Sequence, residues 1–232
     1  MTTDSSGRLA PQPPVGLYVH VPFCVSLCPY CDFVVVAGAA TRGPSNRIAA
    51  FTAALLVELE LRADALEAAF GPPSPSSAGT GTATASGRPP LETVYVGGGT
   101  PTLLPADVLA RLVDTIRRRF GIAAGAEITI EANPARDERG DPEALAAAGV
   151  NRISFGAQSL DRGELRRLGR RHRPADVGEA VQAARDAGIG SINLDLLYDV
   201  PDGSLLTWID TLEAALALEP DHLSLYALTL DD

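Results

Sequence analysis

Three cysteines carry the clearest chemical signal in this sequence. Cys24, Cys28 and Cys31 lie within eight residues of one another, and no other cysteine occurs among the 232 residues. An odd number of cysteines gathered this tightly excludes a disulfide framework, which spreads paired cysteines through the chain. Thiolates are also ligands of zinc and of iron–sulfur clusters. The cysteines therefore predict a metal or cluster site in a reducing compartment, with the cytoplasm as the expected location.

The spacing of the thiols permits two kinds of site. Three thiolates separated by three and then two residues can surround one iron–sulfur cubane, each on a different iron, and leave the fourth iron open to another ligand. Alternatively, the same thiolates can hold a zinc ion with His20 or Asp32 as the fourth ligand. The local spacing does not decide between iron and zinc.

Alternating strand-like and helical segments must position these cysteines. Short β-branched and apolar runs are typical of strands buried on both faces, and they predict six strands over residues 17–21, 93–96, 127–131, 152–155, 192–197 and 222–228. Amphipathic spacing and helix-end residues predict helices over residues 46–70, 105–120, 141–149, 176–187 and 204–218. This alternation predicts an α/β fold with right-handed crossovers, either a barrel or an open sheet.

Two stretches depart from that alternation. Residues 1–14 are polar and proline-rich, and they predict a disordered tail. Residues 71–90 are a low-complexity run of Gly, Pro, Ser, Thr and Ala with few side chains to bury, which predicts a flexible surface insertion. Residues 15–232 are then expected to form one core domain that carries this insertion.

Composition excludes several classes of function. The chain has 29 acidic and 19 basic residues, a net charge of −10, which disfavours nonspecific binding to nucleic acid. All basic residues are arginine, so a lysine Schiff base or a phosphate-loop lysine is excluded within this segment. No apolar run approaches the ~18 residues that a membrane-spanning helix needs. We therefore expect no nucleic-acid partner and no membrane-spanning segment.

The sequence resembles a known family at motifs that occur in order along the chain. LYVHVPFCVSLCPYCDF, at residues 17–33, resembles the CxxxCxxC region of the radical S-adenosylmethionine (SAM) superfamily, and more closely that of the oxygen-independent coproporphyrinogen III oxidase-like family. Further matches are VGGGTPT at 96–102, EANP at 131–134, GVNRISFGAQS at 149–159, RLGR at 167–170, INLDLLY at 192–198 and HLSLY at 222–226. The resemblance implies a partial (β/α)6 barrel with its site at the C-terminal strand ends, and a C-terminal domain that is absent from this chain.

The resemblance also implies the cofactors and the residues that hold them. Cys24, Cys28 and Cys31 would bind a [4Fe-4S] cluster whose open iron chelates SAM, and an electron from the cluster would cleave SAM to a 5′-deoxyadenosyl radical. The residues implied to contact SAM are Tyr18, Tyr30, Gly98, Gly99, Thr100, Glu131, Gln158, Arg170, Asp195 and Ala227.

Several of these residues can also be explained by a structural role that involves no ligand. Gly98 and its neighbours follow a predicted strand, where they could admit a ligand or simply form a tight turn. Glu131 alone reads as a helix-capping or surface acid. Arg170 belongs to a basic stretch, residues 162–173, that is expected to be mostly a solvated helix face. Asp195 differs because it interrupts an apolar run, where an unpaired carboxylate is costly to bury.

One position separates two branches of the family. Oxidases that decarboxylate coproporphyrinogen III carry a fourth cysteine two residues after the third, whereas this chain has Phe33 there. The chain is therefore most similar to the heme-chaperone (HemW-type) branch, which implies heme as cargo, a heme-acceptor protein and an electron donor as partners. The alternatives are a coproporphyrinogen III oxidase acting on a porphyrinogen and a zinc-stabilised, non-catalytic binding module.

Overall fold

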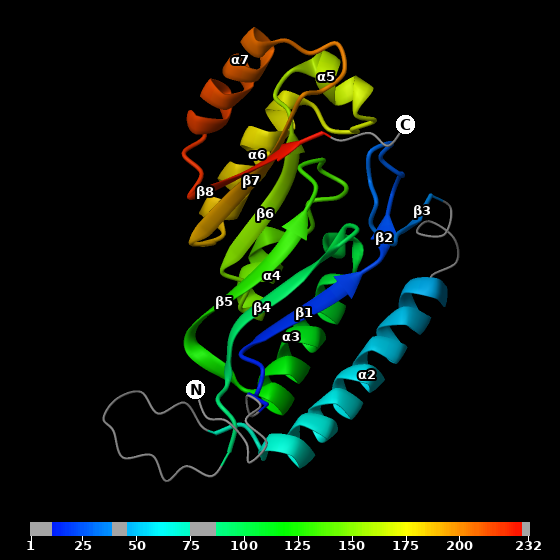
Figure 1. The fold of residues 1–232 in the computed structure, drawn as a ribbon, viewed down its shortest axis with the longest axis vertical. Coiled ribbons are helices and arrows are strands. Elements are labelled where there is room, and N and C mark those ends of the chain that lie inside the picture. Colours follow the sequence, from blue (N-terminus) through cyan, green and yellow to red (C-terminus); the bar gives the residue numbers. More distant parts are fainter. Residues whose placement is uncertain (1–10, 39–45, 75–86, 229–232) are drawn as a thin grey trace.

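Six parallel strands in chain order form the main sheet. In the computed structural model, which describes residues 11–38, 46–74 and 87–228, each strand of this sheet pairs with the next one in it (Figure 1). The strands are β1 (Gly16–Val21), β4 (Leu91–Gly98), β5 (Ile122–Ala132), β6 (Arg152–Gln158), β7 (Ser191–Tyr198) and β8 (His222–Ala227). Sequential order is the arrangement of a β/α barrel, whereas a doubly wound sheet reverses its order at a switch point. Since β1 and β8 are not paired with each other, the fold is a partial barrel, as the resemblance implies.

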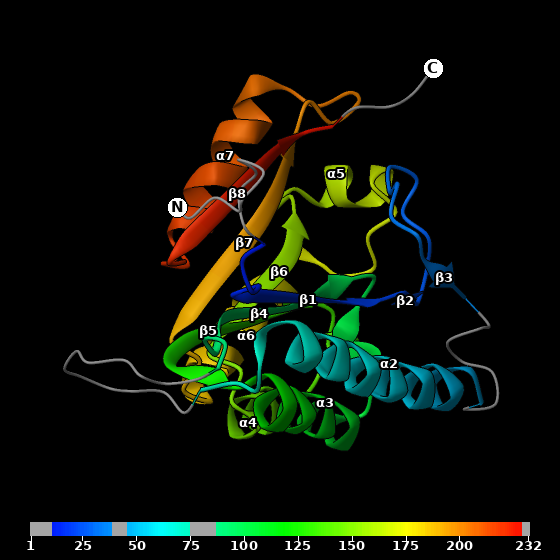
Figure 2. The ribbon, with the colours of Figure 1, turned by 60° about the horizontal axis from the view of Figure 1, so that its bottom comes forward.

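Helices cover the outside of the sheet. Figure 2 shows α2, α3 and α4 on one side of it, and each packs against the next around the barrel. The helices are α2 (Asn46–Phe70), α3 (Ala106–Phe120), α4 (Pro142–Ala148), α5 (Arg162–Arg167), α6 (Pro174–Asp186) and α7 (Leu205–Leu216), with a 3-10 turn, η1, at Pro101–Leu103. Their ends follow local signals: Asp141 caps α4 by accepting from two backbone N–H groups, and Gly149 ends it at φ 102°.

The hydrophobic core lies between the sheet and these helices. The apolar side of α3 is buried as its spacing predicts, with Leu112 and Ile116 almost fully enclosed. Central strand residues such as Ile130, Ile153 and Leu194 are 0–1% exposed. Parallel strands covered on both faces carry such near-continuous apolar runs, and this is why the strand positions could be read from the sequence.

The structure adds elements at both ends of the barrel. A two-residue strand pair, β2 (Phe23–Cys24) with β3 (Val36–Ala37), closes the loop that carries the cysteines and was not predicted. At the opposite end, β5 begins at Ile122, earlier than the predicted residue 127, because Leu91 of β4 pairs with it beyond a register shift. Within the described parts of the chain, no helix is long and apolar enough to cross a bilayer.

The insertion predicted at 71–90 has a hydrogen-bonded base. Residues 75–86 lie outside the described residues, as do residues 1–10 of the predicted tail. The flanking segments bridge at Pro73 and Arg88, where Ser74 N–H donates to the Arg88 carbonyl at 2.9 Å. The buried Arg88 guanidinium donates to the carbonyls of Phe120 at 2.8 Å and Arg119 at 2.9 Å. Arg88 therefore ties the base of the insertion to the C-terminus of α3.

Candidate functional site

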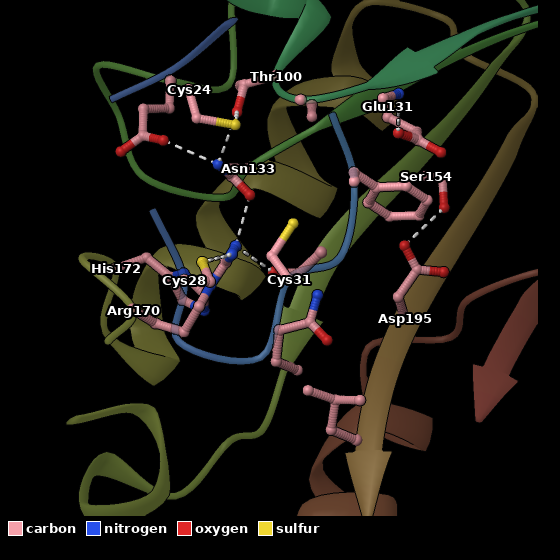
Figure 3. A pocket seen from close by; sticks show the side chains of 18 of the residues that line it. Cys24, Cys28, Cys31, Thr100, Glu131, Asn133, Ser154, Arg170, His172 and Asp195 are labelled. Atoms are coloured by element: carbon pink, nitrogen blue, oxygen red, sulfur yellow. Dashed lines mark hydrogen bonds between the residues drawn. The ribbon is translucent and has the colours of Figure 1, made fainter. Parts of the chain in front are cut away.

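A cavity of about 610 Å³ lies inside the curve of the sheet, towards the C-terminal ends of the strands. Its volume is in the range of small-molecule and cofactor sites. All three cysteines line it, together with residues from β4, β5, β6, β7 and β8 (Figure 3). Most of the residues singled out from the sequence therefore meet around one space.

The cysteine loop is fastened to the sheet at both ends. Gly99 N–H donates to the Val21 carbonyl at 2.8 Å, and Thr100 N–H donates to the Phe23 carbonyl at 2.6 Å. On the far side of the loop, His20 Nε2 hydrogen-bonds the Val34 carbonyl at 2.9 Å. The backbone thus fixes where the cysteine side chains start, although much of the loop itself faces solvent.

The glycines after β4 make room for this loop. A Cβ on Gly99 would lie 2.5 Å from the Phe23 carbonyl oxygen and 2.9 Å from Cys24 Sγ. Gly98 has φ 113°, and a Cβ there would meet the His20 ring at 2.6 Å. The sequence allows a ligand approach or a tight turn for these glycines, whereas the groups that approach them closely here are parts of the protein itself.

The three thiols do not converge in the manner of ligands around a single metal ion. Among the described residues, no three His, Cys, Asp or Glu side chains are gathered closely enough to hold one ion, whereas tetrahedral zinc needs four ligands within about 2.0–2.3 Å of it. Both ring nitrogens of His20, a candidate fourth zinc ligand, are already hydrogen-bonded, to Tyr18 and to Val34. A cubane takes each thiolate on a separate iron, so it does not require the three sulfurs to converge on one ion.

The Cys24 thiol is protonated at neutral pH in the absence of a metal. Burial raises the pKa of Cys24 to about 11, despite a hydrogen bond from Thr100. A thiolate is required for ligation, and a bound metal deprotonates its thiol ligands. Proton release should therefore accompany metal uptake at this site.

Glu131 lies at the end of β5 with two donors already placed on its carboxylate. Tyr95 Oη donates to Oε1 at 2.8 Å, and Gly98 N–H donates to Oε2 at 2.9 Å. Burial raises the pKa of Glu131 despite both hydrogen bonds. This is neither a helix-capping nor an open surface acid, because it faces the cavity. Tyr18 stacks on Tyr95 at 6.0 Å between ring centroids, but it is 55% exposed and does not line the cavity.

Asp195 is paired, which resolves the cost of placing a carboxylate in an apolar strand. Ser154 Oγ donates to its Oδ2 at 3.1 Å, and Asn193 Nδ2 donates to its Oδ1 at 2.7 Å (Figure 3 draws the former). Ser224 in turn donates to Asn193 at 3.1 Å. Burial raises the pKa of Asp195 overall. These three partners were not identified from the sequence, although each is a polar residue inside a predicted strand.

Arg170 differs from most arginines of the basic stretch because its side chain lines the cavity. Its Nη1 donates to Cys28 Sγ at 3.4 Å, and its Nη2 donates to the Gly156 carbonyl at 2.7 Å. Arg162, Arg166 and Arg167 are exposed, as a solvated helix face should be. The guanidinium of Arg170 therefore places a positive charge beside one of the candidate ligand sulfurs.

The ten residues implied to contact SAM divide by whether they line the cavity. Eight of the ten residues that the resemblance implies for SAM line the cavity, whereas Tyr18 and Ala227 do not. Residues of the wall that were not identified from the sequence include Tyr95, Asn133, Glu138, Ser154 and Asn193. Asn133 stands within the EANP match, but a single asparagine carries no signal of its own. Glu138 lies in a loop and is recognisable only by its burial.

Comparison with known proteins places the chain in one superfamily. Residues 80–212 match the model of the radical SAM superfamily. The chain is 39% identical to the heme chaperone HemW of Escherichia coli (strain K12) over 221 residues, and 34% identical to the oxygen-independent coproporphyrinogen III oxidase of Paracoccus denitrificans (strain Pd 1222) over 214 residues. The matches cover 94% and 91% of this chain, but 52% and 42% of those proteins.

One solved structure resembles this chain in sequence as well as in fold. Coproporphyrinogen III oxidase (HemN) from Escherichia coli, described as a radical SAM enzyme, superposes with a TM-score of 0.77 and 29% sequence identity. The superposition covers 95% of this chain and 45% of that one. The chain thus spans about half the length of the relatives it matches.

Proposed function

Because the chain belongs to the radical SAM superfamily, we propose that Cys24, Cys28 and Cys31 hold a [4Fe-4S] cluster and that SAM binds in the cavity beside it. The observation that carries this proposal is the presence of all three thiols in the wall of one 610 Å³ cavity, together with the buried carboxylates Glu131 and Asp195. When bound, the reduced cluster supplies the electron for reductive cleavage of SAM.

The residues of the chain would bind and orient the cofactors. An ionised carboxylate offers about four acceptor sites, and Glu131 uses two of them on Tyr95 and Gly98. Its remaining sites can accept hydrogen bonds from ribose hydroxyls. Asp195 is held in one orientation by Ser154 and Asn193 and can serve the same purpose beside Glu131.

We further propose that the protein is a heme chaperone in the cytoplasm, which binds heme and delivers it to an acceptor protein. Phe33, at the position of the oxidases' fourth cysteine, lines the cavity and is 65% exposed. The same loop exposes Leu27 and Val34. Large apolar side chains open to solvent suit a flat apolar ligand. The 39% identity to a heme chaperone over most of this chain supports the same choice.

The alternative is decarboxylation of coproporphyrinogen III. The likeness to the Paracoccus oxidase and to the HemN structure favours it at the level of fold and cavity. Phe33 is the residue that argues against it, because an apolar ring stands where the oxidases have their fourth cysteine. In either case an external electron donor is required to reduce the cluster.

Anaerobic reconstitution tests the cluster and SAM. We expect iron at cubane stoichiometry, no zinc, and a reduced EPR signal that shifts when SAM is added. A Cys28→Ala variant serves as the control and should lose the SAM-sensitive signal. Zinc in place of iron, or a reduced signal indifferent to SAM, would refute the proposal.

Heme titration then separates chaperone from oxidase. The chaperone proposal predicts saturable heme binding, seen as a shifted Soret band, and no decarboxylation of coproporphyrinogen III when SAM and a reductant are supplied. Phe33→Ser should weaken heme binding and leave the iron content unchanged, because Phe33 contributes no ligand atom. Decarboxylation without heme binding would refute the chaperone proposal and support the oxidase.

A further inference from the structure

A chain of hydrogen bonds joins two of the three cysteines along the cavity wall (Figure 3). Arg170 donates from Nη1 to Cys28 Sγ at 3.4 Å and from Nη2 to the amide oxygen of Asn133. The amide nitrogen of Asn133 donates to Thr100 Oγ1 at 3.0 Å, and Thr100 Oγ1 donates to Cys24 Sγ at 3.9 Å. One amide side chain thus stands between the donor to Cys28 and the donor to Cys24.

Glu138 determines which way this amide faces. Its carboxylate is 3% exposed and accepts from Asn133 Nδ2 at 2.8 Å and from Arg171. A carboxylate only accepts, so the amide NH2 of Asn133 must face Glu138 and its oxygen must face Arg170. Thr100 Oγ1 accepts from the same NH2 group, which leaves the hydroxyl hydrogen of Thr100 to point at the sulfur.

The loop after β5 holds Glu138 in place. Its backbone N–H donates to the Ala135 carbonyl at 2.8 Å, and Thr102 Oγ1 donates to its carbonyl oxygen. A buried carboxylate with these partners is costly to move, because each displaced group would be left unsatisfied. The orientation of the Asn133 amide is therefore fixed by a buried carboxylate of the cavity wall.

We propose that Asn133, oriented by Glu138, is a positioning residue that holds Arg170 and Thr100 as hydrogen-bond donors to Cys28 and Cys24, and so sets the reduction potential of the cluster on these cysteines. This inference rests on the proposed cluster site. Hydrogen bonds to the sulfurs stabilise the extra electron of a reduced cluster, which raises its potential. Partners beyond the ligands tune metal sites in this way.

The test compares Asn133→Ala with Asn151→Ala. Asn151 makes a similar pair of amide hydrogen bonds, accepting from Ile128 N–H at 2.8 Å and donating to the Ala126 carbonyl at 2.8 Å, but it does not line the cavity. Neither substitution changes charge, and both remove a paired amide. The midpoint potential of the reconstituted cluster is measured by EPR-monitored redox titration, and thermal unfolding is followed in parallel.

We expect a more negative midpoint potential in Asn133→Ala, and the wild-type potential in Asn151→Ala although it also loses thermal stability. An unchanged potential in Asn133→Ala, or an equal shift in both variants, overturns the inference while leaving the cluster site standing. Wild-type protein that takes up no iron overturns both. If Asn133→Ala does not fold, Asn133→Leu fills the space without polar groups, and the same potentials decide.

Discussion

Replacing His172 should change how the stability of the metal-free chain depends on pH. His172 lines the cavity but is only 4% exposed, and its Nε2 hydrogen-bonds the Ala157 carbonyl at 3.0 Å. Burial, together with the nearby positive charge of Arg170, lowers the pKa of His172 from 6.5 to about 4. The folded protein therefore keeps this imidazole neutral at pH values where the unfolded chain protonates it.

The sign and size of the effect follow from that difference. Between pH 6.5 and 4 the unfolded state binds the extra proton, so the free energy of unfolding falls as pH falls through this window. A pKa lowered from 6.5 to about 4 corresponds to roughly 3 kcal/mol of unfolding free energy between pH 7.5 and 4. The raised pKa values of Glu131 and Asp195 act on the free energy of unfolding with the opposite sign. Because each carboxyl keeps its proton to a higher pH in the folded state than in the unfolded state, its ionisation destabilises the protein as pH rises. Their contributions cancel when a variant is subtracted from the wild type.

Urea unfolding of wild type and His172→Gln at pH 7.5 and pH 4 measures the difference. Glutamine keeps a donor for the Ala157 carbonyl but does not titrate. We expect the free energy of unfolding of the wild type to fall by about 3 kcal/mol more than that of the variant over this interval. A difference between the two proteins that stays constant with pH would refute the reasoning, since His172 would then titrate as an exposed histidine does.

Three further substitutions probe the loop, the insertion base and the cavity. Gly99→Ala should destabilise the chain by about 1–3 kcal/mol and lower iron uptake, because its Cβ would displace Cys24; wild-type iron content would contradict this. Arg88→Met should cost roughly 3 kcal/mol in urea unfolding because two buried carbonyls lose their donor, whereas Arg62→Met, on an exposed ion pair, should cost less than about 0.5 kcal/mol. Glu131→Gln should weaken SAM binding to the reconstituted protein about 10- to 100-fold, as expected for one charge-assisted hydrogen bond; an unchanged dissociation constant in calorimetry would exclude Glu131 from the SAM site.

Most of the fold could be predicted because strand burial and helix ends leave local signals. The positions of the six strands and the residue range of helix α2 follow from apolar runs and their spacing. The prediction of α4 follows from Asp141 and Gly149. The pair β2–β3 could not be predicted, since two-residue strands have no periodicity and depend on the backbone of Pro22 accepting from Val36. Chain order in the sheet also needed the structure, because the alternation of elements is equally compatible with a barrel and an open sheet.

The site was predictable where a residue type is informative by itself. Three clustered cysteines point to a metal in any fold, and Asp195 is conspicuous in an apolar strand. Asn133 and Glu138 are ordinary residues in a loop, and their importance arises only from burial and from contacts across 33 to 37 positions of sequence. Such partners are determined by tertiary packing, which no local pattern encodes.

The paired base at residues 72–74 and 87–88 brings the two ends of the intervening segment together at the barrel. Once the two ends are joined, doubling the length of the connecting segment costs only about 0.6 kcal/mol in chain entropy. The base also stands before β4, at the end of the barrel opposite the cysteines. A fluorescent domain or affinity tag spliced in at this point would report on the protein, or immobilise it, without obstructing the cavity.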